Sequence, residues 1–219
     1  MSNYKFKVIL VGESGVGKTC IIKQYIDNNF DSEEIPTIAG QEVFKEITIG
    51  KDTIKLTIWD TCGQENFRSI NSIFMKKSNI VIFVYDITNK KSFNELKKYW
   101  YNEVKSYLGK EVVYAVAGNK SDLYEDQVIS ANEGKEFADS FNGIFKETTA
   151  TDYEVISELF YLAAEECLKK KLGVNIIKDN SNSNKNTNDN NGGYSDSNKN
   201  DSEGVNLNDG KKNNNRSWC

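Results

Sequence analysis

A glycine-rich segment directly after a short apolar run places the strongest constraint on how this chain folds. The run is FKVILV, Phe6–Val11, and the segment is GESGVGKT, Gly12–Thr19. The segment matches G-x-x-x-x-G-K-[ST], and helix-spaced apolar residues such as Ile22 and Tyr25 follow it. Strand, glycine loop and helix in this order form an anion cradle, because backbone N–H groups of the loop and the helix start point toward one place. The sequence therefore predicts that a nucleotide phosphate binds here.

Further apolar runs and helical periodicities predict the rest of the fold. The runs Ile80–Tyr85 and Val112–Ala117 are nearly unbroken, as in strands buried on both faces of a parallel sheet. Residues 54–58 alternate between apolar and polar, which predicts a hairpin with the segment near 43–49. Helix-spaced apolar residues are Phe93, Leu96, Trp100, Val104 and Tyr107, and then Ile156, Leu159, Phe160, Ala163 and Cys167. We expect an α/β fold, a doubly wound, mostly parallel six-stranded sheet with one antiparallel edge strand.

Composition limits both the chemistry and the partners. The chain has 219 residues, no histidine and a net charge of -4. Without histidine, Ser-His-Asp and Cys-His nucleophiles and HExxH zinc sites are excluded. The charge balance offers no basic field, so we expect no binding of nucleic acid. Scattered cysteines without CxxC spacing suit the reducing cytoplasm.

A change of composition divides the chain. Up to about Leu172 apolar strand and helix patterns alternate, whereas from about Val174 the residues are mostly Asn, Ser, Asp, Lys and Gly. Such a segment has too little apolar surface to offset the entropy lost on folding. We expect one globular domain over residues 1–173 and a disordered tail over residues 174–219, which ends in Cys219.

Four side chains are candidates for contact with phosphates and Mg²⁺. The Lys18 ammonium would bind the β- and γ-phosphates, and the Thr19 hydroxyl would ligate Mg²⁺. Asp60, in WDTCGQE after the strand at 54–58, would hold the ion through water. Thr37, which follows the only proline of the chain, would reach both Mg²⁺ and the γ-phosphate.

The same segments carry the candidate catalytic groups. Gln64 would orient the attacking water and Gly63 would donate its N–H to the γ-phosphate, with Lys18 and Thr37 completing the set. The segments around Thr37 and Gln64 are expected to be ordered by the terminal phosphate and released without it. Arginine occurs only at positions 68 and 216, neither of which precedes Thr37, where an arginine in cis would act. We therefore expect slow hydrolysis, about 10⁻⁴ to 10⁻² per second, raised ~10³- to 10⁵-fold by a partner's arginine.

The sequence GNKSD, directly after the apolar run at 112–117, predicts which base is bound. The Asp122 carboxylate can accept hydrogen bonds from the ring N–H and the exocyclic amine of guanine. Adenine presents neither donor in that arrangement and would leave the carboxylate unpaired. Asn119 is expected to bond to the purine and to tie this loop to the glycine loop. The stem of Lys120 would lie across the ring.

Together these motifs resemble the Ras superfamily of small GTPases, and within it the Rab family. The similarity runs from about Tyr4 to Leu172 and rests on GESGVGKT, DTCGQE, NKSD and ETTA, with the Rab-type sequences KLTIWDTCGQE, NFRSI and FVYDIT. It implies that Phe30 flanks the guanine and that the Ala150 backbone reaches its carbonyl. The candidate nucleotide-binding residues are Gly12, Ser14, Gly15, Val16, Gly17, Lys18, Thr19, Cys20, Phe30, Thr37, Asp60, Gly63, Asn119, Lys120, Asp122, Thr149 and Ala150.

The resemblance also implies a role and partners. It implies a switch in intracellular vesicle traffic that binds GTP or GDP with Mg²⁺ and hydrolyses GTP. The expected partners are a guanine-nucleotide exchange factor, a GTPase-activating protein, effectors of the GTP state and a GDP-dissociation inhibitor. Cys219 is a candidate prenylation site, and with a lipid there the chain would cycle from the cytoplasm to the cytoplasmic face of an intracellular or plasma membrane. One lipid chain alone gives only marginal anchoring.

Some positions depart from the family pattern, and two other functions stay open. Cys62 replaces the alanine of DTAGQE, Thr151 replaces a lysine after ETTA, and Glu42 stands where an aromatic residue helps form the effector surface. The alternatives are a GTP-binding scaffold with negligible turnover and a P-loop ATP-dependent kinase. Gln64 argues against the first, and Asp122 argues against the second.

Overall fold

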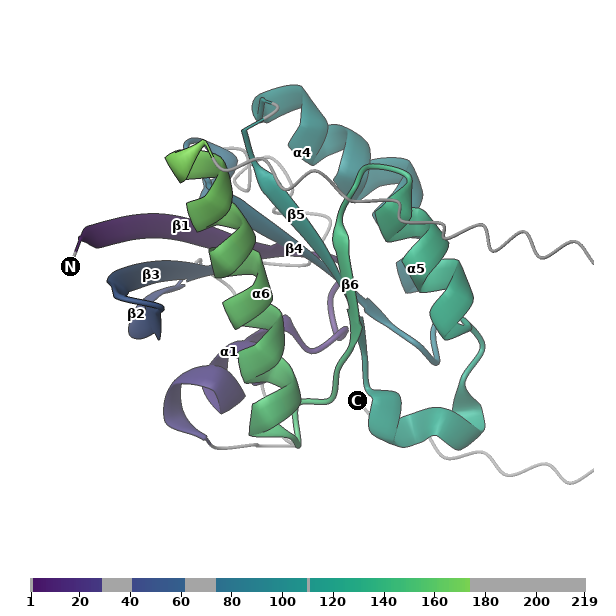
Figure 1. Cartoon of the computed structure of the whole chain (residues 1–219). Helices are drawn as coiled ribbons and strands as arrows, with labels where there is room; N and C mark the ends of the chain where they lie inside the picture. Colours follow the sequence, from purple (N-terminus) through teal and green to yellow (C-terminus); the bar gives the residue numbers. More distant parts are fainter. Residues whose placement is uncertain (1, 29–40, 62–73, 110, 174–219) are drawn as a thin grey trace, which may run out of the picture. The chain divides into compact units, whose positions relative to one another are not determined.

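The computed structural model describes residues 2–28, 41–61, 74–109 and 111–173. Their strands form one six-stranded sheet in the order β2-β3-β1-β4-β5-β6 (Figure 1). The strands are β1 Asn3–Val11, β2 Gln41–Ile49, β3 Asp52–Asp60, β4 Ile80–Asp86, β5 Val113–Asn119 and β6 Ile144–Glu147. All neighbouring pairs are parallel except β2 with β3. The expected doubly wound sheet with one antiparallel edge strand is therefore confirmed.

Helices cover both faces of the sheet. They are α1 Lys18–Asp27, α3 Lys90–Glu95, the π-helical turn η2 Leu96–Trp100, α4 Tyr101–Tyr107, the 3₁₀ segment η3 Ser121–Asp126, α5 Ala131–Asp139 and α6 Tyr153–Leu172. One apolar core packs α1 and α6 against the sheet, and a second core packs α3, η2, α4 and α5 against it. Figure 1 shows α1 and α6 together on one side and α4 and α5 away from them.

Alternation along the central strands explains why two separate cores form. In β1, Val8 and Leu10 belong to the core beneath α1 and α6, whereas Ile9 and Val11 belong to the other core. Successive strand residues point to opposite faces, so a strand covered on both sides is apolar throughout. All seven residues of β4 are buried. Because these central strands are packed on both faces, their carboxyl ends lie in fixed positions, and so do the starts of the loops that follow them.

The edge hairpin has a different pattern. Buried and half-buried residues alternate along β3, while exposed and half-buried residues alternate along most of β2, whose last residue, Ile49, is buried. The turn places Gly50 at φ 60°, a left-handed conformation that suits glycine. The hairpin predicted for residues 43–58 is present, and its strand β2 lies at one edge of the sheet.

Capping residues set the ends of the last helix. The Asp152 side chain accepts hydrogen bonds from the backbone N–H groups of Glu154 and Val155, and Gly173 ends the helix in a left-handed conformation with φ 69°. The last described helix therefore ends at Leu172, and the domain boundary expected near residue 173 stays a prediction. The tail expected beyond it lies outside the described residues. None of the described helices is long and apolar enough to cross a membrane.

One predicted helix differs from the expectation in its geometry. The spacing of Phe93, Leu96, Trp100, Val104 and Tyr107 predicts a single regular face, yet the turn Leu96–Trp100 is π-helical. The first four of these side chains are buried, but Tyr107 is 44% exposed, so its assignment to the buried face is wrong. A π turn holds an extra residue and shifts the phase of the next turn, so one period fitted to the whole run fails there.

Candidate functional site

Glycines allow the loop between β1 and α1 to lie against neighbouring strands. Gly17, at the N-cap of α1, has φ 93°, and a Cβ there would lie 2.3 Å from Nδ2 of Asn119. A Cβ on Gly12 would lie 2.2 Å from the carbonyl oxygen of Val84 in β4. Real Cβ atoms do not come so close to other atoms, so only glycine fits at these two positions. The predicted phosphate loop is thus packed against the carboxyl ends of β4 and β5.

Lys18 is the first residue of α1, and its side chain turns back into the loop. The residue is 5% exposed, and its Nζ donates to the carbonyl oxygens of Gly12 at 2.9 Å and Glu13 at 2.7 Å. A buried ammonium requires such acceptors because little water reaches it. They hold a positive charge inside the loop, beside the start of α1, where exposed N–H groups also favour an anion.

The two described candidates for Mg²⁺ ligation lie in contact. Thr19 Oγ1 donates to Oδ2 of Asp60 at 2.7 Å. Asp60 ends β3 and is only 3% exposed. The next residue, Thr61, donates from Oγ1 to the carbonyl oxygen of Leu10 and so fixes the end of β3 to β1. A hydroxyl and a carboxylate are hard oxygen ligands of the kind that Mg²⁺ accepts while keeping several waters, so this donor pair fits the ion.

The loop after β5 is joined directly to the phosphate loop. Asn119, 1% exposed, donates from Nδ2 to the carbonyl oxygen of Val16 at 2.8 Å. Its Oδ1 accepts a hydrogen bond from Thr148 Oγ1 at 3.2 Å. Three chain segments far apart in the sequence therefore meet at one amide group. Thr148 is not among the residues that the sequence predicts for the site, although it lies within ETTA, because only Thr149 and Ala150 of that motif are assigned to the nucleotide.

Lys120 is fixed by an ion pair that the sequence did not reveal. Its backbone is left-handed, with φ 67°, and its Nζ lies 2.8 Å from Oδ2 of Asp86 at the end of β4. The carboxylate of Asp86 is mostly buried and also accepts from the backbone N–H and the hydroxyl of Thr88. Asp86 lies in the FVYDIT sequence. Its position at the end of a predicted strand was the only sequence feature that could have indicated a role in the site.

Asp122, in the same loop after β5, is in contact with Thr149. Thr149 Oγ1 donates to Oδ1 of Asp122 at 2.6 Å, a short distance typical of a hydrogen bond to a charged group. The backbone N–H of Ser121 donates to the carbonyl oxygen of Thr148 at 3.0 Å, which joins the two loops through their main chains. Asp122 itself is exposed, so its carboxylate remains open to a ligand.

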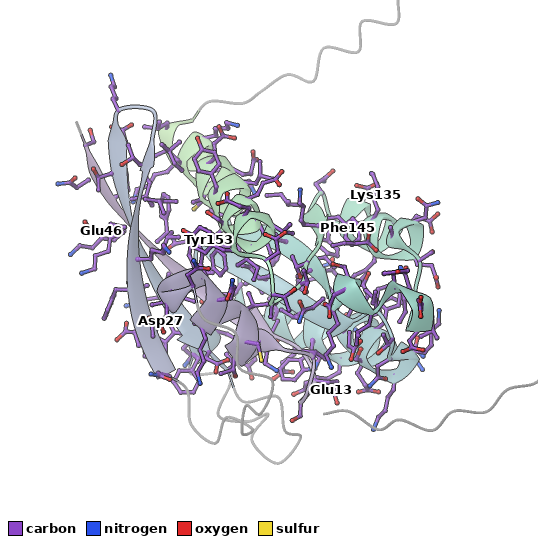
Figure 2. All side chains as sticks on the ribbon, turned by 90° about the horizontal axis from the view of Figure 1, so that it is seen from below. Glu13, Asp27, Glu46, Lys135, Phe145 and Tyr153 are labelled. Atoms are coloured by element: carbon purple, nitrogen blue, oxygen red, sulfur yellow. The ribbon has the colours of Figure 1, made fainter. Side chains whose placement is uncertain are left out.

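A further contact links the phosphate loop to the π turn. Trp100, fully buried at the end of that turn, donates from Nε1 to Oε1 of Glu13 at 2.9 Å. Figure 2 labels Glu13 in the loop that follows β1. The sequence predicts neither residue as part of the site. The indole N–H thus holds the negative charge of Glu13 toward the helix. The rest of the loop is suited to binding an anion.

A second surface lies beside β3, where the family resemblance places effector contacts. The rings of Trp59 and Phe74 are 5.2 Å apart, and Nζ of Lys7 lies 5.1 Å above the Trp59 ring. Burial lowers the pKa of Lys7, while the nearby Glu42 carboxylate opposes that shift. Glu42 is exposed on β2, opposite Trp59 in the strand register. The expected aromatic position on this surface is thus occupied by a charge.

The remaining candidates divide into two groups. Of those described, Val16 and Ala150 are buried, Cys20 is half-buried, and Ser14 and Gly15 are exposed on the loop. Phe30, Thr37, Gly63, Gln64, Cys62 and Cys219 lie outside the described residues. The structure therefore brings together the phosphate loop, the pair Thr19–Asp60 and the loop of Asn119 to Asp122.

Comparison with known proteins agrees with this arrangement. The sequence model of the Ras family matches residues 7–169. The GTP-binding protein ypt1 of Schizosaccharomyces pombe (strain 972 / ATCC 24843) is 37% identical over 173 residues, which cover 79% of this chain and 84% of that protein. Both findings confirm the resemblance seen in the motifs. The chain belongs to the Ras family, as a small GTPase of the Rab type.

Proposed function

We propose that this protein is a guanine-nucleotide switch that binds GTP or GDP with Mg²⁺ and hydrolyses GTP. One observation carries the proposal above all: the hydrogen bond from Asn119 Nδ2 to the carbonyl oxygen of Val16, 2.8 Å long. It joins a loop suited to phosphates with a loop suited to guanine, so that one nucleotide could contact both. The name of the relative ypt1, a GTP-binding protein, supports the same ligand.

Each candidate residue has a definite task in the proposed chemistry, including Thr37, Gly63 and Gln64, which lie outside the described residues. Lys18 would bind the phosphate oxygens, because its buried ammonium already lies inside the loop. Thr19 and Asp60 would hold Mg²⁺, with Asp60 acting through water. The ion, when bound, neutralises negative charge on the phosphates. Gln64 would orient the attacking water, with Thr37 and Gly63 as further contacts to the terminal phosphate.

Base selection is assigned to Asp122. Its exposed carboxylate would accept hydrogen bonds from guanine, while Asn119 and Lys120 hold the loop beneath the ring. The test is equilibrium competition of unlabelled GTP and ATP against a fluorescent GDP. We expect GTP to compete better than ATP by about 10³-fold or more, since adenine leaves the carboxylate unpaired. Equal competition by ATP would support the kinase alternative instead.

Hydrolysis is tested by single turnover with Mg²⁺ and with a chelator. The wild-type protein should hydrolyse GTP slowly and only with the metal. Gln64→Leu should reduce the rate at least about 10-fold without loss of GTP affinity, whereas Lys18→Ala should lose tight binding. No turnover by the wild-type protein, alone or with a GTPase-activating protein, would leave only the scaffold alternative.

The cellular role proposed here is control of vesicle traffic. Membership in the Rab type supports regulation by an exchange factor and a GTPase-activating protein, and recognition of the GTP state by effectors. Because Glu42 is charged, effectors here should differ from those that require an aromatic residue at this position. A prenyl lipid on Cys219 would provide weak, reversible attachment to membranes, and a GDP-dissociation inhibitor could then extract the protein.

A further inference from the structure

The Asp122 carboxylate, which is proposed to select guanine, belongs to a chain of hydrogen bonds that ends at Thr151. Thr149 Oγ1 lies 2.6 Å from Oδ1 of Asp122 and 2.8 Å from Oγ1 of Thr151. The backbone N–H of Thr151 also donates to Thr149 Oγ1, at 3.2 Å. The Thr149 hydroxyl thus has three partners, two of them on residue 151.

The number of protons fixes the direction of each bond. A hydroxyl carries one hydrogen and two lone pairs, and an ionised carboxylate can only accept. Thr149 must therefore give its single hydrogen to Asp122 at 2.6 Å and accept at both other contacts. The hydroxyl of Thr151 consequently donates to Thr149 at 2.8 Å. All bonding capacity of the Thr149 hydroxyl is used, and its hydrogen can point only at the carboxylate.

The backbone around this chain is held on both sides. The N–H of Thr148 donates to the carbonyl oxygen of Gly118 at 2.8 Å, which fixes the loop of Thr149 to β5. On the other side, Asp152 caps α6 through its side chain. Thr149 and Thr151 therefore stand on anchored main chain, and the remaining freedom is mainly that of their side chains.

We propose that Thr151 is a positioning residue for guanine selectivity, which acts through Thr149 to orient the Asp122 carboxylate. The inference rests on the proposed function, because it assigns a purpose to the same base site. In a chain of hydroxyls, each donor polarises the next and strengthens its bond. The lysine that the family pattern has at this position is replaced here by a short hydroxyl side chain, which supplies the first donor of the chain.

The test uses two variants, one that lacks the hydroxyl of residue 151 and one that keeps it. Thr151→Val has nearly the same shape but no donor, while Thr151→Ser keeps the donor. The probes are GDP and inosine diphosphate, each with a fluorescent label on the ribose; inosine lacks the exocyclic amine of guanine. We expect Thr151→Val to release GDP about 2- to 10-fold faster, the effect of one lost neutral hydrogen bond. Inosine diphosphate should change less, and Thr151→Ser should resemble the wild-type protein for both.

A double variant shows whether the effect passes through Thr149. With Thr149→Val already present, adding Thr151→Val should change GDP release little further, because coupled residues are not additive. Three results would overturn the inference. An additive effect of the two substitutions, or equal acceleration of GDP and inosine diphosphate release by Thr151→Val, would mean that Thr151 only maintains the shape of the turn. An unchanged GDP release rate in Thr151→Val would mean that its hydroxyl has no effect on GDP binding.

The wild-type control separates this inference from the proposed function. If the wild-type protein prefers GDP to ADP and Thr151→Val behaves like it, only the inference fails. If the wild-type protein shows no preference for GDP over ADP, the proposed function fails, and the inference fails with it.

Discussion

Asn119 Nδ2 donates a hydrogen bond of 2.8 Å to the carbonyl oxygen of Val16, across 103 positions of the sequence. This bond connects the end of β5 with the loop that precedes α1. A nucleotide bound by both loops would therefore meet two surfaces whose separation is already set. Such preorganisation reduces the ordering cost of binding and favours tight binding of a small ligand.

The first prediction concerns that amide. Asn119→Ala removes the donor to Val16 and the acceptor for Thr148, so buried polar groups lose their partners. If the combined effect on nucleotide binding is about 1 to 3 kcal/mol, GDP affinity should fall between ~5-fold and ~150-fold. The measurement is GDP titration by calorimetry. Asn102→Ala, which removes an exposed bond to the carbonyl oxygen of Lys98, is the control and should leave the affinity unchanged.

The second prediction concerns contact between the two loops. Gly17→Ala would place a Cβ 2.3 Å from Nδ2 of Asn119 and also strain a residue at φ 93°. We expect a loss of more than about 2 kcal/mol of unfolding free energy, together with weaker GDP binding. Gly50→Ala has a positive φ of 60° but no atom within 4 Å of the new Cβ, so it isolates the backbone strain. Equal losses in urea unfolding of the two variants would show that the contact is unimportant.

The third prediction concerns a lysine that ties the edge strand to two helices. Nζ of Lys45 donates to the carbonyl oxygen of Tyr25 and lies 3.2 Å from the hydroxyl of Tyr153, which Figure 2 labels at the start of α6. It also lies 4.3 Å and 4.9 Å above the two rings. Lys45→Met keeps the stem but removes the charge, and should cost about 1 to 3 kcal/mol in thermal unfolding.

The control for this lysine lies on the neighbouring strand. Nζ of Lys55 is 4.7 Å above the ring of Phe44, which is 52% exposed. A cation–π contact in water is weak, so Lys55→Met should cost about 0.5 kcal/mol or less. If both variants unfolded at the wild-type temperature, Lys45 would have no part in holding β2 to α1 and α6.

The fourth prediction concerns pH. Burial raises the pKa of the Cys167 thiol to about 11, against the opposing effect of Lys170 and Lys171. The neutral thiol is therefore favoured in the fold. Since the unfolded thiol ionises near pH ~8.5, this stabilisation is complete below that pH and is lost as the pH rises through about 11.

The thiolate is the species that reacts with alkylating reagents, so the shift in pKa has a direct readout. At pH 8, iodoacetamide should modify Cys167 at least ~100-fold more slowly in the native protein than in urea, because the thiolate fraction is that much smaller. Peptide mass spectrometry follows this cysteine separately from the other three. Comparable rates in the native and unfolded protein would contradict the buried, neutral thiol.

Patterns of short range made most of the fold predictable. The unbroken apolar run of Ile80–Tyr85 identifies a central strand, and alternation in residues 54–58 identifies the half-exposed edge hairpin. The sequence of the glycine loop predicts where the loop lies in the fold and which ligand it would bind. Phosphate binding needs backbone N–H groups and one lysine at fixed spacing. The same reasoning anticipated the tie between Asn119 and the phosphate loop.

Contacts between distant side chains could not be predicted in this way. The pairs Lys120–Asp86, Trp100–Glu13 and Lys45–Tyr153 each join elements whose approach depends on the whole packed fold. The π turn was also hidden, since spacings of three and four residues fit a regular helix equally well.

Hydrogen exchange of residues 29–40 and 62–73 tests the switch most directly. These segments carry Thr37, Gly63 and Gln64, the groups assigned to the terminal phosphate. The protein would be compared when loaded with GDP and with a non-hydrolysable GTP analogue, both with Mg²⁺. Slower exchange in both segments with the analogue, and little change in β4, is the predicted result. Identical exchange in the two loaded forms would contradict the account.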